Sequence, residues 1–162
     1  MSAKKFDLST ITLDAAFREG VRDIFETKIV FNQTLGLKID KLEPMNARAH
    51  ILMKPELVGH FAYSRVHGGV ISAALDAMGG LACMCAMGAQ HHEEPLLERL
   101  KRFTKLGTID LRVDYLRPAI GEKFILKAEV LRLGSRVAST RMEFCAEDGT
   151  LLAAGAAAFI VS

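Results

Sequence analysis

One carboxylate stands in an otherwise uncharged stretch of the chain. The run VISAALDAMGGLACMCAMGA, residues 70–89, contains a single charged side chain, that of Asp76. An ionised carboxylate in apolar surroundings is costly unless it is paired or hydrogen-bonded, and such groups gather at functional sites. Asp76 is therefore the first candidate for chemistry. The alternative is that it bonds a nearby backbone group or serine hydroxyl, or faces water at an edge.

A histidine and two glycines directly precede this run. At the start of a helix, His67-Gly68-Gly69 would leave the first backbone N–H groups unshielded, and those groups carry partial positive charge. Such a site can hold an anion or a developing oxyanion. The other interpretation is a tight strand-to-helix turn. The motif is not a phosphate loop, because Lys-Ser/Thr is missing, and no G-x-S-x-G elbow surrounds Ser72.

The spacing of these two features requires a second subunit if both act on one substrate. Gly68 and Asp76 are separated by about 12 Å along a helix, at 1.5 Å per residue. A carbonyl held at the helix start is therefore out of reach of the same helix's carboxylate. A two-fold dimer with neighbouring antiparallel helices brings the two groups together and creates two equivalent sites. This chemistry predicts a homodimer.

The sequence does not predict a metal site, a disulfide framework or a cofactor. The cysteines are odd in number and form no CxxC motif, which fits neither a disulfide framework nor a zinc ribbon; they are Cys83, Cys85 and Cys145. The first two lie two apart on a helix and point to different sides, so we interpret them as core residues. The run HHEE at 91–94 carries ligand types, but adjacent ligands in a polar loop are usually solvated. A reducing cytoplasm is the predicted location.

The elements that must position the candidates follow from hydrophobic periodicity. Apolar residues recur every three to four positions over 14–30, which predicts an amphipathic helix capped by Asp14. LGLKIDKLE and ARAHILMK alternate, which predicts two strands joined by a turn. The stretch from Gly68 to Ala89 is long enough to span a membrane. Its Asp, its many Ala and Gly residues and its strand-like flanks instead favour a helix buried on all sides.

The C-terminal part of the chain predicts a sheet. A polar loop, HHEEPLLERLKRF, precedes the alternating run TIDLRVDYL, and KFILKAEVLRL, RVASTRMEFCAE and LLAAGAAAFIVS follow it. We expect four strands in a meander, with turns at Gly134–Ser135 and AEDGT. The order of elements predicts an α+β fold in which one antiparallel sheet wraps around a central helix.

Length and composition exclude several classes of protein. A chain of 162 residues is expected to form one domain, 1–162, in which 1–30 is a helix and its lead-in. Half of the residues are hydrophobic (50%), which excludes a disordered chain. Lys and Arg number 21 against 19 Asp and Glu, and this balance excludes a dedicated nucleic-acid binder. The N-terminal MSAKKFDLST lacks the apolar core of a signal peptide.

Several of these motifs occur together, in the same order, in a known family. RVHGGVISAALD, TIDLRVDYLRPAIGEKF, VLRLGSRVAS and a closing strand of small residues resemble the hotdog-fold acyl-CoA thioesterases. Within that family they resemble the phenylacetate-pathway-like (PaaI-like) branch and its bacterial YigI-like members. The resemblance covers roughly residues 30–162. It implies a curved antiparallel sheet around one long helix, assembled as a homodimer or as a homotetramer built from two dimers.

The resemblance implies hydrolysis of a fatty or aromatic acyl-CoA to free acid and CoA. Gly68 would offer its N–H to the thioester oxygen, and His67 would shape the turn. Asp76 of the partner subunit would be general base or nucleophile. Thr108 lies where relatives often carry a hydroxyl that orients the carboxylate or a water. Arg117, Arg132, Arg136 and Gly69 would contact the CoA part of the substrate, since Arg suits phosphate.

The sequence departs from the family pattern at one position. Relatives usually place an Asn six or seven residues before the HGG histidine, near the reacting carbonyl. Here that neighbourhood is Gly59-His60-Phe61, so His60 is expected to fill the slot, unless it is an ordinary loop histidine. The connection over 91–105 is longer than usual and is expected to form part of the substrate mouth.

Three functions stay open at this point. The leading hypothesis is a metal-free thioesterase acting on medium/long-chain or aromatic acyl-CoA. The second is a hotdog dehydratase or hydratase acting on 3-hydroxyacyl or enoyl thioesters, in which His60 and Asp76 would act on one substrate carbon. The third is a non-catalytic module that binds acyl-CoA. No nucleic acid partner and no membrane span are expected.

Overall fold

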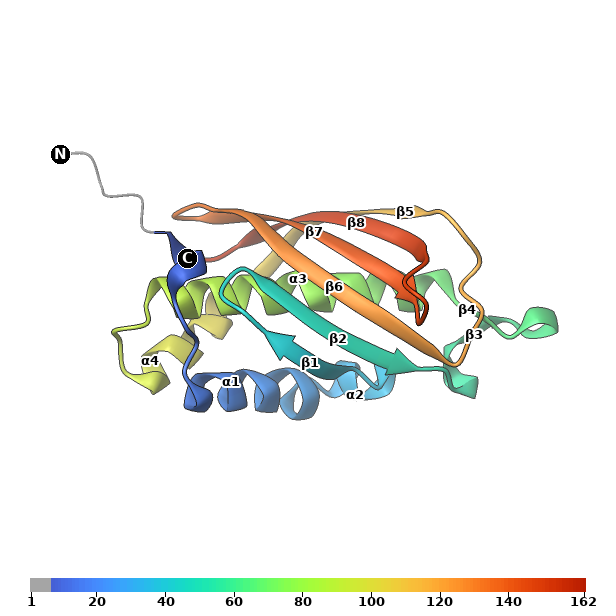
Figure 1. The fold of residues 1–162 in the computed structure, drawn as a ribbon, viewed down its shortest axis with the longest axis horizontal. Helices are drawn as coiled ribbons and strands as arrows, with labels where there is room; N and C mark the ends of the chain where they lie inside the picture. Colours follow the sequence, from blue (N-terminus) through green and yellow to red (C-terminus); the bar gives the residue numbers. More distant parts are fainter. Residues whose placement is uncertain (1–6) are drawn as a thin grey trace.

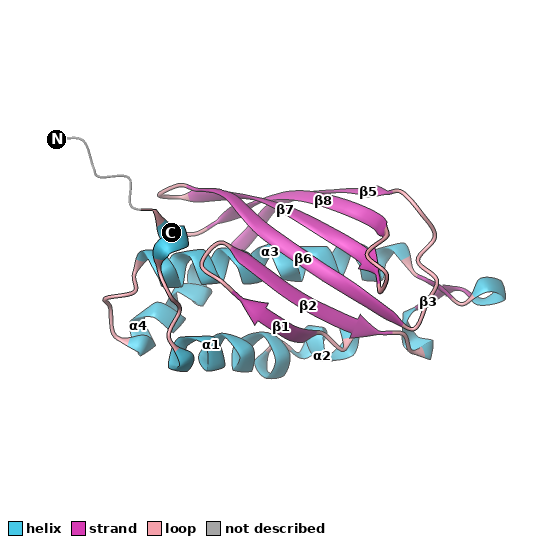
Figure 2. Ribbon diagram, viewed as in Figure 1, coloured by secondary structure: helices cyan, strands magenta, loops and turns pink. Residues whose placement is uncertain are grey.

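The computed structural model describes residues 7–162, so residues 1–6 of the predicted lead-in lie outside it. Six strands form one antiparallel sheet, in the order β1-β2-β6-β7-β8-β5. Figures 1 and 2 show these strands crossing one long helix, α3. The strands are β1 (Lys38–Leu42), β2 (Asn46–Leu52), β5 (Gly107–Tyr115), β6 (Lys123–Leu133), β7 (Val137–Ala146) and β8 (Leu151–Ile160). The predicted α+β fold is confirmed.

Helix α3 (Gly68–Gln90) fills the concave side of the sheet and forms the centre of the core. Its small residues let the sheet approach closely: a Cβ at Gly79 would come within 2.6 Å of the Phe159 ring. By length and apolar composition α3 would suit a membrane, but 72% of its most apolar window is buried inside the protein. It is therefore the core helix. The large side chains packed around it include Leu75, Met78, Phe124, Met142, Phe144 and Phe159.

The helix predicted over 14–30 is present as one unbroken helical segment over 15–28, and a second helix that was not predicted follows it. Asp14 caps α1 (Ala15–Arg22), because its Oδ1 accepts a hydrogen bond from the Phe17 N–H at 2.8 Å. A π-helical turn over Asp23–Lys28 follows, and Ile29 then adopts an extended backbone before α2 (Val30–Leu35) begins. Hydrophobic spacing over so few residues does not separate an α-helical turn from a π-helical one, so the sequence predicted neither the π turn nor α2.

The predicted four-strand meander is wrong in one respect, since β5 pairs with β8 and not with β6. Only β6, β7 and β8 follow one another as a meander within the described sheet. The chain leaves β5 at one edge and crosses the end of the sheet before it enters β6. Alternation identifies strands but not their neighbours, and consecutive strands are adjacent in only about two-thirds of cases.

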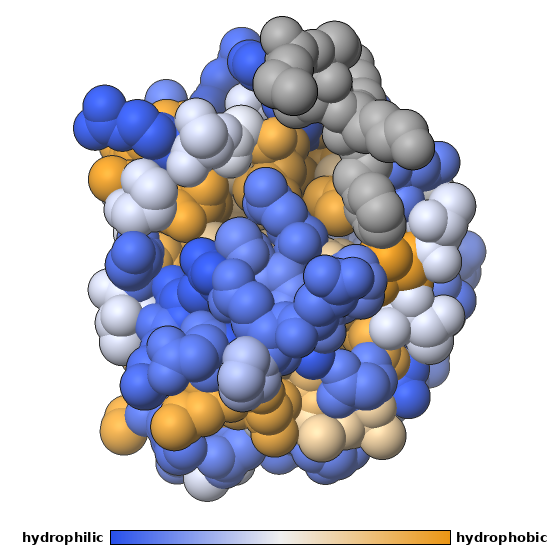
Figure 3. Space-filling view, turned by 90° about the vertical axis from the view of Figure 1, so that its left-hand side faces the viewer, coloured by the Kyte–Doolittle hydropathy of each residue, from blue (hydrophilic) through white to orange (hydrophobic). Residues whose placement is uncertain are grey.

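Two further elements differ from the predictions. The segment predicted as a polar loop contains helix α4 (Leu96–Lys101), which is too short for its periodicity to stand out. Figure 3 views the end of the molecule that carries α4, and hydrophilic side chains cover the middle of that end. Before α3, the strands β3 (Val58–His60) and β4 (Arg65–Val66) form a small hairpin that projects from the body.

Candidate active site

The Asp76 carboxylate is held in place by a hydroxyl from the sheet. Thr108, the second residue of β5, donates a hydrogen bond from Oγ1 to Asp76 Oδ1 at 2.8 Å. Both residues line a hollow of about 290 Å³ whose other walls are mainly apolar. The structure therefore brings together the residue predicted as base or nucleophile and the hydroxyl predicted to orient it.

The sequence predicted that α3 is buried on all sides. Its N-terminal half is not. Ser72, Ala73, Asp76 and Ala77 are half-buried, and Gly69 is exposed. These positions recur at helical spacing, so they form one open face of α3. The prediction failed because the face carries mostly small apolar residues, which look like core in the sequence. Asp76 is the only carboxylate of α3 and stands on this open face.

The histidine and glycines form the cap of α3. The ring Nδ1 of His67 accepts the Gly69 N–H at 2.9 Å, so that amide is already used within the chain. The Gly68 N–H, by contrast, has no acceptor among residues 7–162. Ser72 Oγ donates back to the Gly69 carbonyl at 3.1 Å. Gly68 is thus the one amide of this turn that is available to a ligand.

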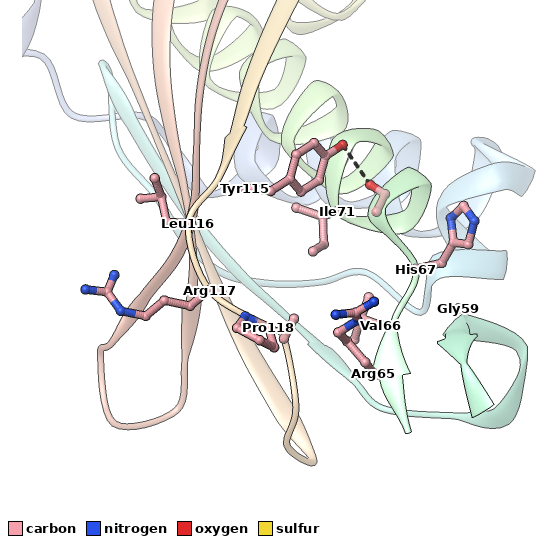
Figure 4. A pocket seen from close by; sticks show the side chains of 11 residues that line it. Gly59, Arg65, Val66, His67, Ile71, Tyr115, Leu116, Arg117 and Pro118 are labelled. Atoms are coloured by element: carbon pink, nitrogen blue, oxygen red, sulfur yellow. Dashed lines mark hydrogen bonds between the residues drawn. The ribbon is translucent and has the colours of Figure 1, made fainter. Parts of the chain in front are cut away.

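Two residues that the sequence did not single out lie against this turn. Tyr115 Oη donates to the Gly68 carbonyl at 3.0 Å, and its ring stands beside Gly68 (Figure 4). Arg65, from β4, lines the same hollow and has no ion-pair partner among the described residues. Tyr115 ends the alternating run TIDLRVDY and is separated from the Arg117-Pro118 step by Leu116, a position that does not mark it as part of a site. Arg65 carried no signal, because β4 is two residues long.

The hollow around Gly68 is separate from the hollow that holds Asp76. It has a volume of about 530 Å³. Its lining residues are Gly59, Arg65, Val66, His67, Gly68, Ile71, Tyr115, Leu116, Arg117, Pro118 and Ala119. None of them lines the Asp76 hollow. Within one chain, the amide and the carboxylate therefore belong to two different sites.

The three arginines predicted for CoA do not form one group within the chain. Arg117 lines the Gly68 hollow, donates to the Leu151 carbonyl at 2.8 Å and points away from His67 in Figure 4. Arg132 and Arg136 are exposed beside the β6–β7 turn. Ile160 of β8 pairs with Val137 after that turn and with Gly107 at the start of β5, so the turn and the start of β5 lie at one end of the sheet. Arg117 follows the other end of β5. The two groups lie at opposite ends of the sheet.

His60 lies outside both hollows. It ends β3, and its ring packs against Phe61 and Tyr63, with centroids 5.9 and 4.9 Å apart. Its Nδ1 is buried and has no hydrogen-bond partner among the described residues. The structure therefore does not bring His60 to Gly68 or to Asp76 within one chain.

The other residues of reactive type are either buried in the core or paired with neighbouring side chains. Burial raises the pKa of Cys83 and of Cys85 to about 12, so neither thiol is a nucleophile at neutral pH. His91 bonds Glu94 at 2.8 Å, and Arg102 bonds the same carboxylate at 2.7 Å. Across residues 7–162, no three His, Cys, Asp or Glu side chains gather as ligands for a metal ion.

Comparison with known proteins identifies the same family that the sequence motifs resemble. The model of the thioesterase superfamily matches residues 63–153. The medium/long-chain acyl-CoA thioesterases YigI of Salmonella typhimurium and Escherichia coli are each 38% identical to this chain, over 87% of it and 91% of the relative. The match at 63–153 spans the α3 cap, Asp76 and Thr108.

Solved structures agree in fold. A Shewanella oneidensis protein related to the thioesterase superfamily has a TM-score of 0.85 and 36% identity, covering 93% of this chain and all of that one (100%). Mouse thioesterase superfamily member 2 has a TM-score of 0.71 at 18% identity, covering 93% and 100%, which supports the hotdog fold alone. The chain belongs to the thioesterase superfamily, as its motifs predicted, and is by class a thioester hydrolase.

Proposed function

We propose that this protein hydrolyses medium- or long-chain acyl-CoA, or an aromatic acyl-CoA, to the free acid and CoA. One observation carries the proposal: an oriented carboxylate, Asp76, opens into a mainly apolar hollow next to the exposed face of α3. The YigI relatives, named as medium/long-chain acyl-CoA thioesterases, support the substrate class. Free cysteines support the proposed cytoplasmic location.

Thioester hydrolysis needs two groups on the reacting carbonyl. An N–H donor must stabilise the negative charge that develops on the oxygen, and the Gly68 amide at the positive end of α3 suits this role. A carboxylate on the other side must attack the carbon or take a proton from water, and Asp76 suits that role. Thr108 keeps one carboxylate oxygen fixed, which leaves the other oxygen free to act.

We infer that the complete site forms between two copies of the chain. The amide and the carboxylate lie in different hollows, about 12 Å apart along α3. If two α3 helices cross antiparallel at Ser72 and Ala73, each Gly68 comes opposite the partner's Asp76. The open face of small residues permits that close approach. Strand β5 is also an unpaired edge, with Ile109 55% exposed, which suits pairing with a second β5.

The proposed dimer would also bring the arginines predicted for CoA to one end of the paired sheets. When two β5 edges pair antiparallel, the end of one strand lies beside the start of the other. Arg117 of one copy then lies at the same end as the β6–β7 turn of the partner subunit, which carries Arg132 and Arg136. We propose that Arg65 joins Arg117 in contacting the phosphates, because it lines the Gly68 hollow without an ion-pair partner in the described structure.

Release of free CoA thiol tests this function. Asp76→Asn keeps the size of the side chain and its contact with Thr108 but removes the base or nucleophile. We expect turnover of decanoyl- or palmitoyl-CoA to fall at least ~100-fold, the low end of general-base effects. Asp114→Asn is the matched control, since this exposed carboxylate on β5 pairs with Arg112 and should leave turnover unchanged. Equal rates for wild type and Asp76→Asn would refute the proposal, and hydration of enoyl-CoA by the wild type would favour the hydratase.

A further inference from the structure

The hollow beside Asp76 is a groove that runs beside α3. Its α3 side consists of Ala73, Asp76, Ala77 and Gly80, which stand on one helical face. Leu106 lies beside Gly80, and Thr108 bonds Asp76. The chain from Thr108 back to Phe103 therefore follows the groove from the carboxylate toward the C-terminal end of α3.

A further wall of the groove comes from the N-terminal helices. Phe25, Ile29, Phe31 and Asn32 line it, from the π-helical turn Asp23–Lys28 through the first residues of α2. Asn32 is 3% exposed, and its Nδ2 donates to the Phe25 carbonyl at 3.0 Å. This bond fixes the irregular turn, so Phe25 is held in one position on the wall.

Two aromatic rings of the lining meet on the Leu106 side of the groove, since the Leu106 N–H donates to the Phe103 carbonyl at 3.1 Å and Leu106 lies beside Gly80. Phe25 and Phe103 pack edge to face, with ring centroids 5.7 Å apart. Phe25 is 2% exposed, whereas Phe31, on the α2 wall, is 58% exposed. The groove is thus open along α2 and closed where the two walls touch.

We propose that the Phe25–Phe103 pair closes the acyl site and sets the longest acyl chain that the enzyme accepts. The inference rests on the proposed function, because it assumes that the reacting carbonyl lies at Asp76 and that the acyl chain enters the apolar groove. Each methylene that reaches an apolar wall instead of water strengthens binding about fourfold. A chain that meets the two rings gains nothing from further carbons.

Two substitutions lengthen the groove and a third shortens it. Phe103→Ala opens its end, and Phe25→Leu does so without emptying the core around it. Gly80→Ala shortens the groove instead: the new Cβ would stand 3.6 Å from Leu106 and 3.8 Å from Phe159, which is ordinary contact. That change also favours the helix, so loss of folding is not expected. Leu52→Ala, a 57% exposed side chain at the end of β2, is the control.

The measurement is kcat/KM over saturated acyl-CoAs from four to eighteen carbons. We expect the ratio of palmitoyl- to octanoyl-CoA to rise at least about tenfold in Phe103→Ala and Phe25→Leu, and to fall by a similar factor in Gly80→Ala. Leu52→Ala should match the wild type. Ratios that stay at the wild-type value in all three groove variants would overturn the inference.

Calorimetry with non-hydrolysable thioether analogues separates this inference from the proposed function. If the wild type releases no thiol from any acyl-CoA, the proposed hydrolysis is refuted. The ratio of Kd for the long analogue to Kd for the short analogue then tests whether the groove binds the acyl chain. Opposite shifts in the Phe103→Ala and Gly80→Ala variants would then support the groove as an acyl site, and unchanged ratios would reject it.

Discussion

At the scale of single residues, the hydrogen bond between Thr108 and Asp76 decides how the carboxylate is presented. A hydrogen bond to a charged group contributes about 1.5–3 kcal/mol. Thr108→Val removes the hydroxyl while it keeps the shape of the side chain. We expect kcat to fall about tenfold to 100-fold with little change in KM, because the substrate does not need this hydroxyl for binding.

Two companion variants make the prediction specific. Thr108→Ser retains a hydroxyl and should restore most of kcat. Thr104→Val alters a nearby exposed threonine whose hydroxyl bonds only the Lys101 carbonyl among the described residues, and it should have no effect on kcat. A Thr108→Val enzyme with wild-type kcat would show that Asp76 does not depend on this bond.

Residue types revealed part of the site, because some chemistry is visible without a fold. Asp76 stood out through its apolar neighbours, and Gly68 through its place before them. Tyr115 and Arg65 did not stand out, since an aromatic ring at the end of a strand and a basic residue on a surface are common. Their contacts arise only when β5 and the β3–β4 hairpin converge on the start of α3.

At the scale of elements, an ion pair joins the start of α1 to α4 and to the C-terminal part of α3. Arg99 is 3% exposed and donates hydrogen bonds to Asp14 Oδ2 at 2.5 Å and to the Gly88 carbonyl at 3.2 Å. Its guanidinium lies 4.2 Å from the centre of the Phe17 ring. The hydrogen bond from Arg99, then that from the Phe17 N–H, lowers the pKa of Asp14 below its ordinary 3.8. The folded state thus prefers the ionised carboxylate.

The sign of the pH dependence follows from that direction. A carboxyl whose pKa is lower in the folded than in the unfolded state stabilises the protein above the unfolded pKa, and this contribution is lost as pH falls through the folded pKa. Asp14→Ala also removes the helix cap, at a cost of about 0.5–2 kcal/mol. We expect the free energy of unfolding to fall by more than the cap alone accounts for at pH 7, because the ion pair with Arg99 is lost as well, and the difference from wild type to shrink below pH 3.8.

Urea titrations at several pH values measure this difference. Glu19→Ala, an exposed position on α1, should change the free energy of unfolding by less than about 0.5 kcal/mol at every pH. A difference between Asp14→Ala and wild type that stays constant from pH 7 down to pH 3 would mean that the charge of Asp14 does not contribute.

The elements were predictable where one period holds over many residues. The strands that follow α3 agree with the sequence to within one or two residues, because burial of one face imposes their alternation, and the length of α3 agrees because one uninterrupted apolar run spans it. The π turn at 23–28, the helix at Leu96–Lys101 and the placement of β5 beside β8 were not predictable. The π turn is fixed by the bond from Asn32 to the Phe25 carbonyl, α4 is too short for its periodicity to stand out, and the place of β5 depends on pairing with the distant C-terminal strand.

At the scale of the whole molecule, the proposed dimer would cover the open face of α3 and the free edge of β5 together. Strand β5 pairs with β8 on one side only, and its exposed Ile109 and Tyr115 would be unusual on a free edge. A two-fold dimer uses the same patch on both copies. Each catalytic centre would then combine the Gly68 amide of one copy with the Asp76 carboxylate of the other.

Mixed dimers test this composition directly. Gly68→Pro removes the amide proton but suits the first position of a helix, and His67, at φ −64° and ψ 137°, already has the backbone that precedes a proline. Homodimers of Gly68→Pro and of Asp76→Asn should both be nearly inactive. A heterodimer of the two contains one centre with both native groups, so we expect about half of the wild-type activity per dimer.

The control pairs the Asp76→Asn chain with a chain that carries both substitutions, because that heterodimer has no complete centre and should stay inactive. Differently tagged, co-expressed chains allow each heterodimer to be purified before thiol release is measured. Restored activity would require the amide and the carboxylate to come from different copies, since neither chain alone holds both. A purified heterodimer of the two single variants that stays as inactive as its parents would place both groups on one chain. The roughly 12 Å that separates them along α3 would then have to be bridged by the substrate itself.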